Sequence, residues 1–261
     1  MFSNEHKLYI KKIKKQNHLV LFSKIFILFS FLIVWEGCAR CEILNPFLTS
    51  YPSQIFLTIF DLFKDNNLFS HIWVTLYETI ISFLLASIIG IVISSILWSN
   101  NIISRILDPY LTVLNSLPKV SLGPLIIIWI GASTNSIIFM ALLIAVFTTI
   151  INMYNAFINS DPYKIVLMKS FGASKFQIFT KLIFRGNIPS LVNTLKINIS
   201  LSLIGVIMGE LLVSKQGLGY LITYGTQVFN LNLVITSIFI LGIISYMLYI
   251  LIDLLERKIN N

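Results

Sequence analysis

Long apolar runs separated by short polar stretches dominate this sequence of 261 residues. A helix needs roughly 20 apolar residues to cross a hydrocarbon core about 30 Å thick. Six stretches meet that requirement, at residues 21–38, 75–98, 106–130, 135–157, 191–213 and 231–255. The pattern predicts an all-α, polytopic membrane protein with about six transmembrane helices.

The third stretch is interrupted by Pro118, Lys119 and Pro124. A charge at the middle of a membrane helix costs at least about 2.5–3.5 kcal/mol. We therefore expect this helix to break near Pro118. The backbone that follows should be buried in protein or line a cavity.

Composition agrees with the membrane assignment, since 56% of the residues are hydrophobic and only 11% are charged. Soluble domains carry about 25% charged residues, so a soluble globular enzyme and a disordered chain are both excluded. Chemistry is restricted as well. Cys38 and Cys41 lack the partner Cys or His residues that a four-ligand zinc site needs, and none of the three histidines lies well inside a span, so no intramembrane protease centre can be assembled from them.

The position of the charges predicts the topology. With the N-terminus inside, the inner segments hold 13 of the 19 lysines and arginines. The positive-inside rule then places both termini in the cytoplasm. We expect a basic tail at 1–20, a transmembrane domain at 21–255 and a second tail at 256–261. The net charge of +8 is read as a topology signal facing the lipid bilayer, and no nucleic acid is expected as a partner.

Two predicted spans carry stripes of small residues at helical spacing. Such stripes either let helices pack closely or line a polar path, and both readings stay open. Glu210, near the outer end of its span, is either a solvated carboxylate or a pathway group. The candidates for pathway or packing are Ser82, Ala86, Gly90, Ser94, Pro118, Lys119, Asn198, Ser202, Gly205, Gly209 and Glu210.

A loop of about thirty residues, 160–188, separates the fourth and fifth spans and has helical signals of its own. Asp161 precedes a proline and reads as an N-cap of a helix that ends near Gly172. Ser174 and Gln177 have the spacing of a capping box for a second helix, which ends before Pro189. Four lysines and an arginine accompany its apolar residues. The loop would lie on the membrane surface or dock into a protein partner.

Several segments resemble permease subunits of bacterial ATP-binding-cassette importers. The loop segment MKSFGASKF at 168–176, followed by Ile188-Pro189, resembles the "EAA" loop of that family. Other stretches are similar to the nitrate/sulfonate/taurine branch, with a MetI-like permease fold: Tyr51-Pro52-Ser53, Leu117-Pro118-Lys119, Trp129-Ile130-Gly131, Gly209-Glu210-Leu211-Leu212 and Gln216-Gly217-Leu218-Gly219-Tyr220. The Glu-Ala-Ala itself falls on Val166, Leu167 and Met168, so the acidic residue of the family pattern is missing.

The resemblance implies a non-enzymatic transport subunit of the bacterial inner membrane that works by alternating access. It would pair with a second copy of itself and receive a small solute from an extracytoplasmic binding protein. That solute would be sulfonate-, taurine- or nitrate-like, or a pyrimidine precursor of thiamine. No cofactor is expected, because ATP would be bound by a separate ATPase. The implied ATPase-coupling residues are Asp161, Met168, Lys169, Gly172, Ala173, Ser174, Lys175, Phe176, Phe179 and Pro189, and the implied outer-loop residues are Gly217, Gly219 and Tyr220.

Two other classes compete with this hypothesis. A self-sufficient carrier or channel would need an ionisable relay near the membrane midplane or broken-helix repeats. A membrane scaffold would use the loop to recruit a partner without transport. The sequence contains no G-x-x-x-x-G-K-[ST] phosphate loop, so any ATP hydrolysis must be done by another chain.

Overall fold

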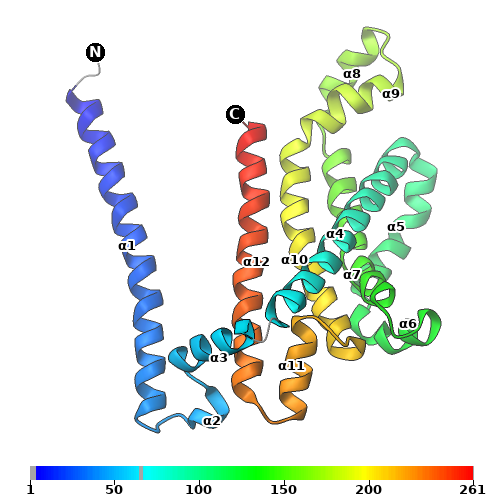
Figure 1. The fold of residues 1–261 in the computed structure, drawn as a ribbon. Helices are drawn as coiled ribbons and strands as arrows, with labels where there is room; N and C mark the ends of the chain where they lie inside the picture. The colour runs from blue at the N-terminus through cyan, green and yellow to red at the C-terminus, as the bar shows by residue number, and fades with distance from the viewer. Residues whose placement is uncertain (1–3, 65–66, 261) are drawn as a thin grey trace.

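The computed structural model describes residues 4–64 and 67–260, and within these residues every regular element is helical. Figure 1 shows the arrangement. In chain order the elements are α1 (Asn4–Arg40), α2 (Pro46–Thr49), α3 (Pro52–Lys64), α4 (Asn67–Ser99), α5 (Asn101–Ser116), η1 (Lys119–Leu122), α6 (Gly123–Ile130), α7 (Thr134–Ile158), α8 (Pro162–Ser170), α9 (Lys175–Ile178), η2 (Phe179–Phe184), α10 (Ile188–Val213), α11 (Leu218–Gln227) and α12 (Leu231–Asn260).

Five of these helices, α1, α4, α7, α10 and α12, are long and apolar enough to cross a membrane. A sixth span results if the bent pair formed by 101–116 and 119–130 counts as one. The two halves of this pair meet at 83°. The predicted all-α membrane fold is therefore confirmed, together with the break at Pro118. Pro118 disfavours a helical backbone at the residue before it, and Leu117 is accordingly extended, with a ψ of 140°.

The centre of the bundle is α7, which packs against both α4 and α10, and these two helices also contact each other. Small residues make this contact close. A Cβ atom at Gly90 of α4 would lie 2.5 Å from the Thr149 side chain of α7. A Cβ at Gly205 of α10 would lie 2.5 Å from the Ala141 Cα, also on α7. The glycines thus let three nearly apolar helices pack closely. Such packing stabilises helices in lipid, where no hydrophobic effect drives them together.

Helix α1 lies to one side of this bundle and reaches it mainly through α2 and α3 (Figure 1). Glu36 near its end accepts hydrogen bonds from the Ser53 backbone N–H at 3.0 Å and from the Ser53 hydroxyl at 2.8 Å. Arg40 donates to the same carboxylate at 2.7 Å. The carboxylate thereby satisfies orphan donors at the start of α3. The apolar pattern of the sequence does not predict α2, α3 or α11, because they are too short to register as spans.

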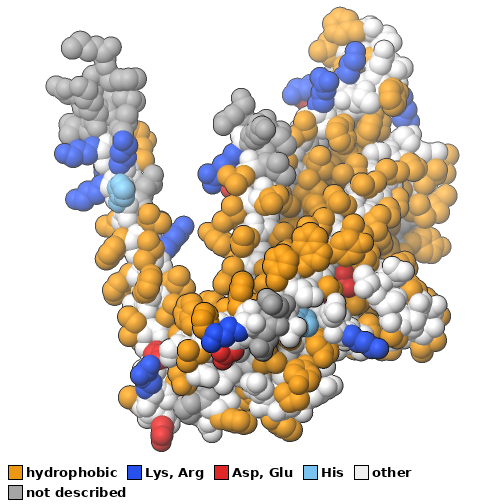
Figure 2. Space-filling model, viewed as in Figure 1, with side chains coloured by type: hydrophobic (Ala, Val, Ile, Leu, Met, Phe, Trp, Pro, Cys, Tyr) orange, Lys and Arg blue, Asp and Glu red, His pale blue; other side chains and the backbone are white. Residues whose placement is uncertain are grey.

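Both described chain ends and the α8–α9 loop lie at the same end of the molecule (Figure 1). Helix α1 runs through most of the predicted basic tail, and its 37 residues make it longer than one span, at about 55 Å. Residues 1–3 of that tail and Asn261 of the second tail lie outside the described residues. Lysines and arginines gather at the α8–α9 end, whereas the middle of the visible surface is apolar (Figure 2).

Candidate functional site

The loop between α7 and α10 has the local structure that its sequence predicts. The Asp161 carboxylate caps α8 by accepting from the Tyr163 backbone N–H at 2.9 Å. Gly172 has a φ of +76°, which permits the reversal after α8. Ser174 and Gln177 form the capping box of α9. The second helix continues from α9 into η2, a π-helical turn, up to Phe184.

The tip of this loop exposes large apolar side chains. No residue of α8 is buried. Tyr163 is 84% exposed, Phe171 is 79% exposed and Phe176 is 76% exposed. Lys164 and Lys169 lie among them and are also exposed. An exposed apolar patch with a polar rim is typical of a surface that binds a partner.

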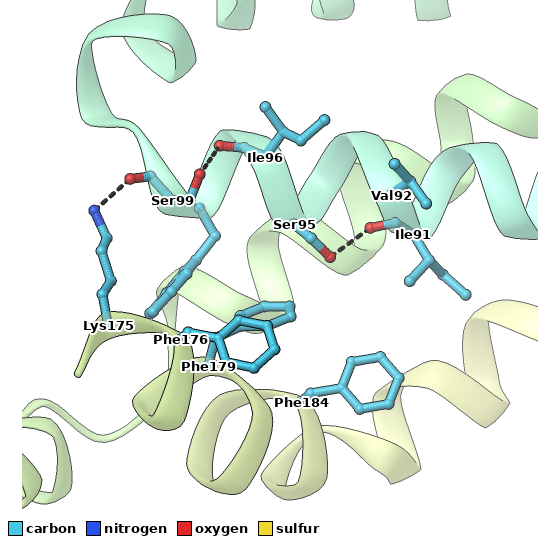
Figure 3. Close-up of a pocket in the computed structure, with 10 residues that line it drawn as sticks. Ile91, Val92, Ser95, Ile96, Ser99, Lys175, Phe176, Phe179 and Phe184 are labelled. Carbon is cyan, nitrogen blue, oxygen red and sulfur yellow. Dashed lines mark hydrogen bonds between the residues drawn. The ribbon is translucent and has the colours of Figure 1, made fainter. Parts of the chain in front are cut away.

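The base of the same loop is packed firmly into the bundle. The Phe179 ring lies 5.1 Å from Trp98 at the end of α4 and 5.4 Å from Phe157 at the end of α7, measured between ring centroids. Met168 and Ala173 pack against the same cluster. Lys175 donates to the backbone carbonyl of Ser99, which Figure 3 shows. The base of the loop is therefore joined to the ends of both α4 and α7.

A cavity of about 560 Å³ lies between α4 and the start of this second helix. Figure 3 shows Phe176, Phe179 and Phe184 on one side and the Ile91–Ile96 stretch of α4 on the other. Pro189, the remaining loop candidate, lies in the first turn of α10. There its missing N–H costs nothing, since the first turn has no acceptor for it.

The small-residue stripes lie inside the helix interfaces. Ser82, Ala86, Gly90 and Ser94 are all buried, and both serines hydrogen-bond to the backbone of their own helix. In α10, Asn198, Ser202, Gly205 and Gly209 are buried as well. Asn198 donates to the Ser87 hydroxyl at 2.6 Å, which joins α10 to α4. Within one copy of the chain these residues lie at helix–helix contacts, where Asn198 Oδ1 and Ser202 Oγ have no hydrogen-bond partner among the described residues.

One of the two interpretations of Glu210, a solvated carboxylate, is wrong, because the residue is only 1% exposed. Oε1 accepts from the Thr75 hydroxyl and Oε2 from the Gly219 backbone N–H, each at 2.6 Å. Gly217 (φ +109°) leaves no room for a side chain, since a Cβ there would lie 2.3 Å from the Glu210 carboxylate. Glycines in the outer segment therefore allow its backbone to lie close to this carboxylate.

Two further side chains complete this outer cluster. His71 Nδ1 accepts a hydrogen bond from the Gly217 N–H at 3.0 Å, and its ring stacks on that of Tyr220 with 5.8 Å between the ring centroids. Glu78, one turn along α4 from Thr75, is fully buried, and neither of its carboxylate oxygens has a hydrogen-bond partner. Glu210 and Thr134 are polar neighbours of Glu78. His71, Thr75 and Glu78 are not among the site residues that the sequence predicts, although their spacing places them on one face of a helix.

Pro118 and Lys119 lie at the break between α5 and α6. Lys119 donates to Asn115 Oδ1 at 3.1 Å, and the Thr148 hydroxyl of α7 lies 3.4 Å from the same oxygen. Along α7 the polar side chains continue at Asn152 and Asn155. These two line a cavity of about 290 Å³ together with Asn193 of α10.

We name this set the polar row: Asn115, Lys119, Thr148, Asn152, Asn155 and Asn193. Apart from Lys119 we had not selected these residues. The i, i+4, i+7 spacing of residues 148, 152 and 155 is the signal that could have identified them. Among the described residues, no group of three or more His, Cys, Asp or Glu side chains could hold a metal ion.

Comparison with known proteins identifies the family. Residues 82–261 match the model described as "binding-protein-dependent transport system inner membrane component". The formylaminopyrimidine transport permease protein ThiX of Halalkalibacterium halodurans is 29% identical over 87% of this chain and 90% of its own. The taurine transport system permease protein TauC of Escherichia coli is 23% identical over 88% of this chain and 85% of its own.

Solved structures agree on the fold. An inward-facing structure of the MetNI methionine ABC transporter covers 74% of this chain and 95% of its own, with a TM-score of 0.64 at 21% identity. The family match, the relatives and the membrane fold point to one assignment. The chain belongs to the binding-protein-dependent transport system inner membrane components and is the membrane-spanning permease subunit of an ATP-binding-cassette importer.

Proposed function

We propose that the α8–α9 loop is the segment through which a separate cytoplasmic ATPase moves this permease. The observation that carries the proposal is the contrast between the two ends of the loop. Its tip exposes Tyr163, Val166 and Phe171, whereas its base is buried against Trp98 and Phe157. A docking element needs both an exposed anchor and a stiff attachment.

The character of the tip favours a protein partner over the lipid surface. Aromatic side chains that insert into a pocket dominate binding energy at protein interfaces. Tyr163, Val166 and Leu167 project from one side of α8 at spacings of three and four residues. A helix with such anchors fits a groove on a partner. The two charged neighbours, Lys164 and Lys169, would lie at the rim of that groove.

The attachment of the loop supports a lever mechanism. Phe179 contacts both Trp98 of α4 and Phe157 of α7, and Lys175 is bonded to the last turn of α4. When ATP binding draws two ATPase subunits together, each would pull on its loop. The displacement would reach α4 and α7 as a rigid-body shift. Alternating exposure of the pathway to the two sides follows from such rocking.

The pathway itself would be formed with a second copy of the chain. The polar row supports this arrangement, because Asn155 and Asn193 are exposed on the surface of one copy and Asn152 lies beside them. Uncharged amides at membrane depth avoid lipid and face protein or water. A homodimer would place two such rows opposite each other and enclose them.

The orientation follows from the same account. The loop lies at the same end as both described chain ends, so an ATPase on the cytoplasmic side places both termini there too (Figure 1). The binding protein would then deliver its solute near Gly217, Gly219 and Tyr220 at the opposite end. Relatives are named as permeases for formylaminopyrimidine, aliphatic sulfonates and taurine. We propose a small solute of these classes for this chain.

The coupling proposal is tested with Phe171→Asp. The substitution places a charge at the exposed tip without disturbing the buried base. We expect binding of the ATPase to weaken by more than about 30-fold, which corresponds to the loss of roughly 2 kcal/mol at an interface anchor. Solute-stimulated ATP hydrolysis should fall in parallel.

Phe229→Asp is the matched control. Phe229 is 74% exposed at the other end of the molecule, and its φ of +55° suits aspartate. This variant should bind the ATPase normally. Normal ATPase binding and stimulation by the Phe171→Asp protein would refute the docking assignment.

A further inference from the structure

Lys119 occupies an unusual position in the broken third span. Helix α5 ends at Ser116 and α6 begins at Gly123. Lys119 is the first residue of η1, which lies between them. Its ammonium group donates to Asn115 Oδ1 at 3.1 Å and lies 5.5 Å from the centre of the Phe147 ring. Both neighbours are uncharged. The lysine side chain is therefore held in place by uncharged groups, without a counter-ion among the described residues.

The depth of this group follows from its contact with α7. Thr148 shares the Asn115 oxygen with Lys119, at 3.4 Å. Thr148 is the fifteenth residue of the 25-residue α7, about 21 Å along a helix about 37 Å long. The cluster of Asn115, Lys119 and Thr148 consequently lies near the middle of the membrane, out of reach of lipid headgroups.

A second lysine in a span provides the internal comparison. Lys196 of α10 pairs with Asp253 at 2.6 Å and also with Glu256, both of α12. That lysine has its counter-ions within the chain. Within residues 4–64 and 67–260, no carboxylate lies within 4.0 Å of the Lys119 ammonium, since none of the ion pairs there includes it. An intramembrane charge without a partner is expected to serve a pathway.

The surroundings of Lys119 are suited to receive an anion. Irregular backbone at membrane depth, such as that after Pro118, occurs only where it is buried in protein or lines a water-filled cavity. The amide of Asn115 and the hydroxyl of Thr148 add hydrogen-bonding groups beside the charge. From Thr148 the polar row leads along α7 toward the cytoplasmic end at Asn152 and Asn155. A solute released from Lys119 would meet uncharged polar groups next.

We propose that Lys119, positioned by Asn115, binds the negatively charged group of the transported solute in the middle of the pathway. The proposal rests on the permease function and narrows its solute class to small anions. Carboxylates, sulfonates and other oxyanions share the chemistry that an ammonium group recognises. Because lysine acts as a point charge with three donors, it holds such a group without imposing one geometry and so allows its release.

The test uses the full chain in complex with its ATPase and needs no knowledge of the solute. Cys38→Ser and Cys41→Ser remove the native thiols, and Thr148→Cys places one thiol beside Lys119. Its reaction rate is measured with anionic sulfonatoethyl methanethiosulfonate and cationic trimethylammonioethyl methanethiosulfonate, without nucleotide and after trapping with ATP and vanadate. A cysteine at the exposed Phe229 corrects for the intrinsic reactivity of the two reagents.

We expect the corrected ratio of rates to favour the anionic reagent by at least about tenfold. Lys119→Gln should abolish this preference, and Lys119→Arg should retain it. An unchanged ratio in the Lys119→Gln protein would overturn the proposal. So would a thiol at position 148 that reacts with neither reagent in either state.

A second measurement concerns the solute itself. The ligand that co-purifies with the cognate binding protein is identified by mass spectrometry, and we expect it to carry an anionic group. A solute without one contradicts the proposal while leaving the permease function intact. Failure of the permease function would instead appear as a lack of ATP-dependent uptake by the unmodified chain.

Discussion

The Thr75 hydroxyl of α4 donates to Glu210 Oε1 of α10 at 2.6 Å, across 135 residues of sequence. The same hydroxyl accepts from the Leu218 backbone N–H at 2.9 Å. Glu210 in turn accepts from Gly219. Two side chains thus fasten the start of α11 to two spans, and the segment that faces the binding protein in our account is rigidly held.

Gly217→Ala should break this arrangement. The added Cβ would lie 2.3 Å from the Glu210 carboxylate, at a φ of +109° that side chains rarely adopt. We expect a loss of stability of about 1–3 kcal/mol, from strain and lost hydrogen bonds together. Thermal unfolding of the detergent-purified protein measures it. Gly242→Ala, where nothing lies within 4 Å of the new methyl group, is the control and should be neutral or stabilising.

The two buried glutamates should respond differently to an isosteric amide. Glu210 accepts two hydrogen bonds as a carboxylate. Glu210→Gln removes its charge, and we expect the free energy of unfolding to fall by about 1–3 kcal/mol. Glu78 is buried next to the Glu210 carboxyl, so Glu78→Gln removes one of two adjacent acidic groups and should be neutral or stabilising. Unfolding temperatures of the two variants decide the matter. Equal losses would show that Glu78 has a partner that its geometry does not reveal.

Close packing of α10 on α7 makes Gly205→Ala costly. Its Cβ would lie 2.5 Å from the Ala141 Cα, and a backbone cannot move aside as a flexible side chain can. Overpacking of this kind costs about 1–3 kcal/mol. Gly37→Ala of α1, with open space around it, is the matched control. If the two variants unfold at the same temperature, the helix interface is looser than described.

The orientation can be measured by thiol labelling in intact cells. With Cys38 and Cys41 replaced by serine, a cysteine at the exposed Ser170 should be protected from an impermeant maleimide. A cysteine at the exposed Lys215 should react. When the permease is expressed without its ATPase, cell lysis should make both reactive, which controls for local burial. Labelling of position 170 but not of position 215 in intact cells would invert the topology.

Local features of this fold were predictable because their causes are local. Pro118 breaks a span, Asp161 and Ser174 cap helices with their side chains, and Gly172 turns the chain, all through interactions within a few residues. The pairing of Thr75 with Glu210 was not, because no periodicity joins residues so far apart. The sequence also does not predict which neighbour the polar row faces. A helix that is apolar on nearly every side does not reveal which side meets which neighbour.

The most direct test of the central claim is solute uptake into proteoliposomes that contain this chain. The solute is the ligand of the cognate binding protein, and ATPase, ATP and binding protein are each omitted in turn. Our account predicts uptake only when all three are present, and its loss in the Phe171→Asp protein but not in the Phe229→Asp protein. Uptake that proceeds without the ATPase would contradict it and show a self-sufficient carrier or channel.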